Sequence, residues 1–171
     1  SFGLPDSVRN KIHNYAVKIC KAVKYNNVGT VEFLAHPSQS AKKENAEPEW
    51  DIYFIEVNPR IQVEHTVTEM VTGIDLVKTQ IFIAGGYKLS DTQIKIPSQE
   101  SIKTDGYAVQ CRVTTEDPEQ DFKPDYGTVI TYRSPGGFGI RLDAGSVYQG
   151  VNISPFFDSM LVKVTASGRT L

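Results

Sequence analysis

The segment 56–65 (EVNPRIQVEH) contains the polar side chains whose types and spacing best fit a chemical role. Successive side chains of an extended chain point to opposite faces, so the even-numbered positions are expected to share one face. Pro59 favours this extended form, because it lacks a backbone N–H and disfavours helix at the residue before it. Carboxylates, amides and a guanidinium crowded on one surface are unfavourable unless a bound group uses them. The set comprises Glu56, Asn58, Arg60, Gln62 and Glu64.

A simpler explanation of this segment is an Arg60–Glu64 ion pair on a strand edge, with the other side chains solvated. Structural ion-pair networks have the same composition as many functional clusters. The segment alone is therefore compatible with both interpretations.

Glu32 supplies a further carboxylate, inside an apolar run at 28–35 that predicts a strand. If this strand pairs antiparallel with the apolar strand at 52–55, Glu32 and Glu56 lie near each other on one face. Two ionised carboxylates that close repel each other unless a proton or a cation lies between them. Mg²⁺ prefers oxygen ligands and commonly binds through one or two carboxylates plus substrate phosphates. Together with Asn58, these residues predict a Mg-nucleotide site.

The elements that must position these residues follow from the apolar pattern. A helix is expected at 6–23, where the apolar residues fall on one helical stripe. The polar segment 36–50 has no periodicity and is expected to be a long hairpin loop between the two strands. A second helix is expected from Asp75 to the glycine pair at 85–86.

The second half of the chain predicts a different architecture. Antiparallel strands are expected at 107–115, 127–133 and 160–166, with a short edge strand at 94–97. In the first of these strands Arg112 falls on the polar face, which suits a catalytic arginine and a surface arginine equally. The glycine-rich segment 135–139 lacks the lysine and the following helix of a phosphate-binding loop, so we expect a turn there.

Composition limits the class of protein. The chain has 171 residues, 40% hydrophobic and 22% charged, with a formal net charge of -2, as in ordinary globular chains. This charge provides no electrostatic footprint for nucleic acid or an anionic membrane, and no apolar run reaches the length of a transmembrane helix. Cys20 and Cys111 lie among apolar neighbours and are expected to be buried thiols in a reduced compartment, with a disulfide between them as the alternative. The first residue is not Met, which favours a piece of a longer protein.

Several motifs resemble the biotin carboxylase component of biotin-dependent carboxylases, which belongs to the ATP-grasp superfamily. The resemblance rests on GTVEFL at 29–34, on the run from FIE at 54–56 through EHTVTE at 64–69, and on QCRV at 110–113 followed by EDP at 116–118. It is closest to the pyruvate-carboxylating members, through CRVTTEDP at 111–118, FKPDYG at 122–127 and SPFFDSMLVK at 154–163. It covers the chain apart from the loop at 36–50, which is longer than expected for the family. QVEH at 62–65 is highly specific, since other ATP-grasp enzymes continue differently after a shared Asn-Pro-Arg.

The resemblance implies a binding role for two sets of residues. Glu32 and Glu56, with Asn58, match the positions that hold Mg²⁺ (or Mn²⁺) against the phosphates of ATP, so both glutamates also belong to the ATP site. The second set matches the bicarbonate pocket and comprises Arg60, Gln62, the backbone at Val63, and Glu64.

The resemblance also implies catalytic roles. Glu64 matches the base that acts on bicarbonate, which then attacks the γ-phosphate of ATP to give carboxyphosphate. Arg60 is grouped with it as catalytic, because a guanidinium fork suits a planar, carboxylate-like anion. Arg112 matches the arginine that stabilises the biotin enolate as the ureido nitrogen takes up CO₂. A fixed cation aimed at charge that develops during the reaction is an effective catalytic device.

The expected fold class is α+β: the C-terminal part of an ATP-grasp domain at 1–98, followed by the antiparallel-sheet start of the biotin carboxylase C-terminal domain at 99–171. The implied activity is that of an ATP-dependent ligase, which carboxylates carrier-bound biotin for transfer to pyruvate, giving oxaloacetate. The alternatives are an acyl-CoA or urea as acceptor, another ATP-grasp ligase, or a nucleotide-binding module without catalysis.

The implied partners lie mostly outside this chain. They are ATP, bicarbonate, and the biotinyl carrier and carboxyltransferase domains of the same enzyme, which is expected to be a homo-oligomer. No nucleic acid or membrane partner is expected, and the implied location is the cytoplasm, or the mitochondrial matrix in a eukaryote. The isolated chain is expected to be inactive.

Overall fold

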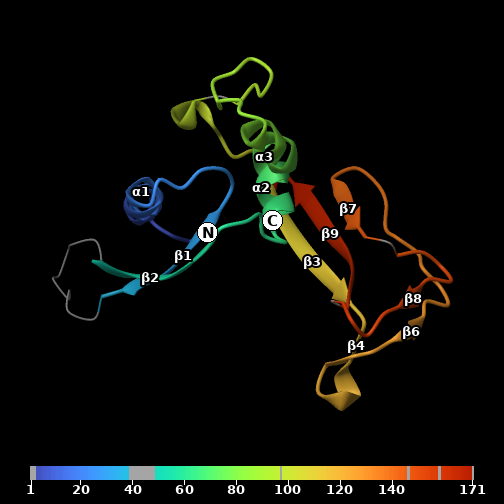
Figure 1. Ribbon diagram of the computed structural model, residues 1–171. Coiled ribbons are helices and arrows are strands. Elements are labelled where there is room, and N and C mark those ends of the chain that lie inside the picture. The colour runs from blue at the N-terminus through green and yellow to red at the C-terminus, as the bar shows by residue number, and fades with distance from the viewer. Residues whose placement is uncertain (1–2, 39–48, 97, 146, 158, 171) are drawn as a thin grey trace. The chain divides into compact units, whose positions relative to one another are not determined.

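The computed structural model describes residues 3–38, 49–96, 98–145, 147–157 and 159–170. The chain forms two compact units (Figure 1). The first comprises Ser1–Gln62 and Leu76–Ile94, and the second comprises Val63–Asp75 and Lys95–Leu171. Each unit is described by itself below. The helices and small antiparallel sheets of the two units confirm the expected α+β class. No helix in the described part of the chain has the length and apolar character needed to cross a membrane.

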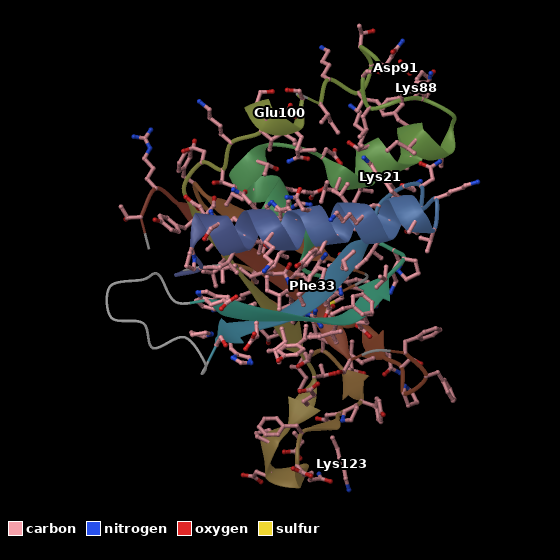
Figure 2. All side chains as sticks on the ribbon, turned by 90° about the vertical axis from the view of Figure 1, so that its left-hand side faces the viewer. Lys21, Phe33, Lys88, Asp91, Glu100 and Lys123 are labelled. Atoms are coloured by element: carbon pink, nitrogen blue, oxygen red, sulfur yellow. The ribbon has the colours of Figure 1, made fainter. Side chains whose placement is uncertain are left out.

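The first unit contains helix α1 (Asp6–Ala22), a hairpin of strands β1 (Thr30–Pro37) and β2 (Trp50–Asn58), and helix α3 (Leu76–Ala84). Pro5 occupies the N-cap of α1, and Asp6 in the first turn accepts a hydrogen bond from Arg9 at 2.8 Å. The aromatic rings of Tyr15 on α1 and Phe33 on β1 lie 6.4 Å apart, and Figure 2 shows Phe33 on the hairpin beside the helix. The predicted helix at 6–23 is confirmed.

The hairpin is antiparallel and places Glu32 directly opposite Glu56, as expected, with an irregularity of the register at Glu32/Phe33. The strands run further than the sequence predicted, since His36 and Pro37 pair with Asp51 and Trp50. The prediction of a loop at these positions was wrong, because antiparallel pairing satisfies the polar backbone whatever the side chains are. Residues 39–48 of the predicted loop lie outside the described residues.

Helix α3 confirms the helix predicted before the glycine pair, and Gly86 ends it with a φ of +90°. Asn27 Nδ2 donates to the carbonyl of Gln80 at 3.1 Å, which joins the loop after α1 to this helix. The predicted edge strand at 94–97 was wrong for its described residues. Ile94 N–H donates to Asp91 O at 3.0 Å in a turn, so a local backbone bond replaces strand pairing, and Pro97 lies outside the described residues.

The second unit is built on a three-stranded antiparallel sheet in the order β3 (Tyr107–Thr114), β9 (Met160–Gly168), β7 (Ile140–Ala144). The strands predicted at 107–115 and 160–166 are confirmed. The strand predicted at 127–133 was wrong beyond its first residues. Only β6 (Gly127–Thr128) forms, pairing with β8 (Asn152–Ile153), and Ile130 is 82% exposed, so it has no apolar surface to pack against. The remaining short elements are β4 (Glu116–Asp117), β5 (Lys123–Pro124), and 3₁₀ turns at Gln99–Ser101 and Pro118–Gln120.

Helix α2 (His65–Thr72) was not predicted. The strand ends at Asn58, where Arg60 N–H turns back to the Asn58 carbonyl at 2.8 Å, and Glu64 becomes the N-cap residue of α2. The expectation of one continuous extended face from 56 to 64 was therefore wrong beyond Asn58. The helix ends at Gly73, whose φ of +69° is favourable for glycine.

The two faces of the β3–β9–β7 sheet differ in character. Helix α2 lies on the face that carries polar side chains, which form two cross-strand rows. The opposite face is apolar, yet Val109 is 56% and Val113 is 40% exposed. Cys111 lies on this open face and Cys20 is half-buried; both are free thiols, but the prediction that they are buried was wrong. The polar rows comprise Arg112, Lys163 and Asp143, then Gln110, Thr165 and Arg141.

Candidate functional site

The first group of predicted site residues lies at the end of the β1–β2 hairpin in the first unit. Glu32 and Glu56 face each other across the two strands. The Asn58 amide lies between them, and its Nδ2 donates to Glu56 Oε1 at 2.8 Å and to Glu32 Oε1 at 3.0 Å. Gln62 Nε2 donates to the same Glu32 oxygen at 2.9 Å. Amide N–H groups therefore occupy the space between two carboxylates that would otherwise repel each other.

This donor set fits a metal ion held jointly with a substrate. Among the described residues, no group of three or more His, Cys, Asp or Glu side chains could hold a metal. Two carboxylates and one amide leave several coordination positions to other ligands, which suits Mg²⁺ with nucleotide phosphates and water. Turning the Asn58 amide over would present Oδ1 in place of Nδ2 and complete a set of three oxygen donors.

Arg60 and Gln62 end the first unit. Arg60 Nη1 donates to the carbonyl of Ile61 at 3.2 Å, and its side chain is exposed. Its guanidinium therefore keeps most of its donors available for an anion.

The second group of predicted residues lies in the second unit, where Arg112 on β3 meets Glu64 at the start of α2. Arg112 Nη2 donates to Glu64 Oε2 at 3.0 Å, and the side chains are 53% and 51% exposed. The Glu64 carboxylate makes no capping hydrogen bond to the helix, so it can face the arginine. A carboxylate and a guanidinium are thus held side by side at the surface of this unit.

The backbone of Val63, the third residue of this group, is held by Lys163. Lys163 Nζ donates to the Val63 carbonyl at 3.2 Å, and the lysine residue is only 9% exposed. Asp143 Oδ2 lies 3.9 Å from the same ammonium. Three elements therefore meet at this point: the segment before α2, β9 and β7.

Two further contacts fasten α2 to the sheet. Thr66 is fully buried, and its hydroxyl hydrogen-bonds to Gln110 Oε1 and to the hydroxyl of Thr165, 2.7 Å away. Because Thr66 donates its single proton to Gln110, Thr165 donates to Thr66. The three side chains form a hydrogen-bond network between α2, β3 and β9 inside the second unit.

At the next turn of α2, the buried carboxylate of Glu69 accepts a hydrogen bond from Arg141 Nη1 at 2.6 Å. Arg141 also donates to Asp143, and His65 Nε2 lies 3.7 Å from Glu69. Burial lowers the pKa of Arg141, but its hydrogen bonds to Glu69 and Asp143 raise the pKa overall, so the guanidinium stays charged.

The residues that fasten α2 were missed from the sequence. One signal was available, since strand alternation places Gln110 on the same face as Arg112. No comparable signal existed for Thr66 or Glu69, because the helix that carries them was not predicted. Alternation in the predicted strand at 160–166 places Lys163 and Thr165 on one face, but it does not identify their partners.

Comparison with known families gives two matches that together cover most of the chain. The family described as carbamoyl-phosphate synthase L chain, ATP binding domain, matches residues 1–92. The family described as biotin carboxylase C-terminal domain matches residues 110–171.

Individual relatives agree with these families. Pyruvate carboxylase from Staphylococcus aureus is 53% identical over 165 residues, which is 96% of this chain and 13% of that protein. The structure of Rhizobium etli pyruvate carboxylase T882A with acetyl coenzyme A matches 99% of this chain and 16% of its own, at 49% identity and a TM-score of 0.86. The Hydrogenobacter thermophilus 2-oxoglutarate carboxylase biotin carboxylase domain dimer, in complex with MgADP, ADP and bicarbonate, matches 99% of this chain and 34% of its own, at 39% identity and a TM-score of 0.82.

The chain thus spans about an eighth of the length of its curated relatives, within one region of them. Both family matches, and the identity over nearly the full length of the chain, point to the same region. The chain therefore belongs to the biotin carboxylase family, and it corresponds to part of the biotin carboxylase domain of pyruvate carboxylases.

Proposed function

We propose that this chain contributes to an ATP- and bicarbonate-dependent carboxylation of carrier-bound biotin, whose carboxyl group is then transferred to pyruvate to give oxaloacetate. The observation that carries the proposal is the contact between Glu64 and Arg112. The proposed base for bicarbonate and the proposed cation for the biotin enolate lie 3.0 Å apart, although 48 positions separate them in the sequence. An arginine with no role in the site would not be expected to contact this particular carboxylate.

Each residue has a stated part in this reaction. Glu32, Glu56 and Asn58 would hold Mg²⁺ (or Mn²⁺), which neutralises phosphate charge when bound, and both glutamates thereby belong to the ATP site. Arg60, Gln62, the backbone of Val63 and Glu64 form the bicarbonate pocket. Glu64 takes the bicarbonate proton as a bicarbonate oxygen attacks the γ-phosphorus and ADP leaves, which yields carboxyphosphate. Carboxyphosphate then breaks into CO₂ and phosphate, and the phosphate takes the proton of the biotin ureido nitrogen. Arg112 stabilises the negative charge on the ureido oxygen while that nitrogen bonds to CO₂.

Pyruvate is the acceptor favoured by the sequence identity of this chain to carboxylases of known acceptor. Identity to the curated pyruvate carboxylases of Staphylococcus aureus and Bacillus subtilis is 53% and 50% over nearly the whole chain. It is 39% to the 2-oxoglutarate carboxylase domain and 40% to the biotin carboxylase subunit of another pyruvate carboxylase. The acceptor would be bound by a carboxyltransferase domain outside this chain. The sequence similarity therefore supports pyruvate through common ancestry, and no residue of this chain would contact the acceptor. An acyl-CoA or urea acceptor is the alternative that the assay below distinguishes.

We further propose the division of the chain at residues 98/99, between an ATP-grasp part and the C-terminal domain of a biotin carboxylase. The longer protein would supply the biotinyl carrier and the carboxyltransferase domain and would act as a homo-oligomer. It would work in the cytoplasm, or in the mitochondrial matrix if the source is a eukaryote.

The proposal is tested on the full-length protein by measuring ATP cleavage with and without bicarbonate, and the transfer of labelled bicarbonate to added acceptors. We expect bicarbonate-dependent cleavage and label in oxaloacetate when pyruvate is present. The acceptor panel includes acetyl-CoA, propionyl-CoA, urea and 2-oxoglutarate. ATP cleavage that ignores bicarbonate would reject the biotin carboxylase activity, and label in another acceptor would reject pyruvate.

Matched variants connect the activity to this chain. Glu64→Gln keeps the shape of the side chain but removes the base, so we expect it to abolish bicarbonate-dependent cleavage. Glu119→Gln makes the same chemical change at an exposed position of the second unit and should leave the activity intact. Equal activity of the two variants would remove Glu64 from the mechanism.

A further inference from the structure

Lys163 occupies the middle of the polar row that crosses the β3–β9–β7 sheet. It pairs with Arg112 on one side and with Asp143 on the other. Its side chain is 11% exposed, which is rare for a lysine, because a buried ammonium is unfavourable without partners. An apolar residue would be the ordinary choice for a position covered by a helix. The lysine therefore needs a specific explanation.

The partners of the ammonium provide that explanation. Asp143 is at the outer limit of an ion pair, with Oδ2 3.9 Å from Nζ. That oxygen is buried and accepts no hydrogen bond among the described residues. Among the described residues, Lys163 Nζ donates one hydrogen bond, to the carbonyl of Val63 at 3.2 Å. The Lys163 ammonium thus donates its hydrogen bond to a backbone group, and the nearby Asp143 carboxylate compensates its positive charge.

The Val63 carbonyl belongs to the peptide unit that joins Val63 to Glu64. A peptide unit is planar, so holding its oxygen also sets the direction of the Glu64 N–H. The hydrogen bond from Lys163 therefore also holds the backbone of Glu64, whose carboxylate accepts a hydrogen bond from Arg112 at 3.0 Å. Lys163 also adds a second positive charge beside Arg112, which favours an anion at this end of α2.

We propose that Lys163 is a positioning residue for bicarbonate, acting through the Val63–Glu64 peptide unit. This inference rests on the proposed function, since it specifies how the pocket assigned to bicarbonate is held. Loss of the contact leaves the sheet in place but frees the peptide unit and removes one cation. The expected defect is therefore in bicarbonate binding, and ATP binding is spared.

The test is steady-state kinetics of the full-length enzyme carrying Lys163→Met, which keeps an unbranched side chain but removes the charge and the donor. We expect the KM for bicarbonate to rise by about 10-fold or more, while the KM for ATP changes by less than about twofold. Lys163→Arg retains a charged donor and should recover at least part of the loss. If Lys163→Met does not fold, Lys163→Gln takes its place, with an expected rise of about threefold or more.

Thr165→Val is the matched control, because Thr165 lies two positions along on the same face of β9 and also contacts α2, through Thr66. It should lower the melting temperature without changing the KM for bicarbonate. An unchanged bicarbonate KM in Lys163→Met, or an equal rise in Thr165→Val, would overturn the inference. Failure of the proposed function is distinct from both outcomes, since the wild-type enzyme would then show no bicarbonate-dependent ATP cleavage.

Discussion

Arg112 Nη2 lies 3.0 Å from Glu64 Oε2, which joins the middle of strand β3 to the residue that precedes helix α2. Each side chain is about half exposed, at 53% and 51%, so the pair is open to a substrate. An exposed ion pair contributes little to stability. The pair is better explained by the proposed reaction, in which each group would keep the other in place until the substrates bind.

The first prediction concerns the arginine of this pair. A group that acts mainly on charge developing in the transition state affects kcat when it is lost. Arg112→Ala in the full-length enzyme should therefore lower kcat for biotin carboxylation by about 10²-fold or more, by analogy with the loss of one oxyanion donor. The KM for ATP should change little. Arg133→Ala removes an exposed arginine elsewhere in the second unit and serves as the control. Biotin carboxylation by Arg112→Ala at the wild-type rate would assign the enolate role to another residue.

A contrasting result is expected for Arg60. Its exposed guanidinium donates to the neighbouring backbone carbonyl of Ile61, and we propose that it binds bicarbonate in the ground state. Arg60→Ala should act more on the KM for bicarbonate than on kcat. Arg60→Lys keeps the charge but loses the fork, so it should recover the function only in part. A fall in kcat with no change in the bicarbonate KM would contradict the assignment.

The third prediction concerns the proposed metal site. Glu56→Gln in the intact enzyme replaces an anionic oxygen ligand with a neutral amide of the same shape, so the use of Mg-ATP should weaken while the fold is retained. The measurement is the Mg²⁺ dependence of bicarbonate-driven ATP cleavage, which should shift to higher Mg²⁺. Glu49→Gln, at the opposite end of the same hairpin, is the matched control. An unchanged Mg²⁺ dependence in Glu56→Gln would remove the metal role.

The sequence was most informative where one local rule decides the structure. Strand alternation and antiparallel pairing correctly placed Glu32 opposite Glu56, and the same alternation placed Arg112 on the polar face of β3. The placement of Arg112 needed only the period of a strand, and the placement of Glu32 opposite Glu56 also needed the partner strand to be the next one along the chain.

The remaining features depend on contacts between distant segments. Helix α2 is eight residues long, and so short a helix is stabilised by packing more than by its own propensity. The hydrogen-bond partners of Thr66 lie on β3 and β9, 44 and 99 positions away. The strand predicted at 127–133 is absent after Thr128 because the contact that would stabilise it is missing: Ile130 is exposed and packs against no apolar surface. Lys163 was unpredictable because its partner is a backbone carbonyl, which carries no residue-type signal.

A fourth prediction concerns the isolated 171-residue chain. The apolar face of the β3–β9–β7 sheet is open at Val109 and Val113, and exposed apolar patches of this kind promote association. The isolated chain should therefore associate in a concentration-dependent manner, as measured by sedimentation velocity, and should not turn over ATP. Val109→Lys should reduce the association, whereas Val23→Lys, which replaces a lone exposed valine after α1, should not. Biotin-dependent ATP cleavage by the isolated chain would show that the active site has been misplaced.

The last prediction tests what holds α2 to the sheet. The Thr66 hydroxyl is fully buried and bonds to both Gln110 and Thr165. Thr66→Val keeps the volume and branching but removes both bonds, which leaves the buried Thr165 hydroxyl and the half-buried Gln110 amide without this partner. The free energy of unfolding of the second unit should fall by about 1–3 kcal/mol, measured by urea denaturation. Thr68→Val makes the same change on the exposed side of α2 and should change the stability by less than about 0.5 kcal/mol. Equal stability of the two variants would show that α2 is held by its charged contacts alone, through Glu69 and the residues around Glu64.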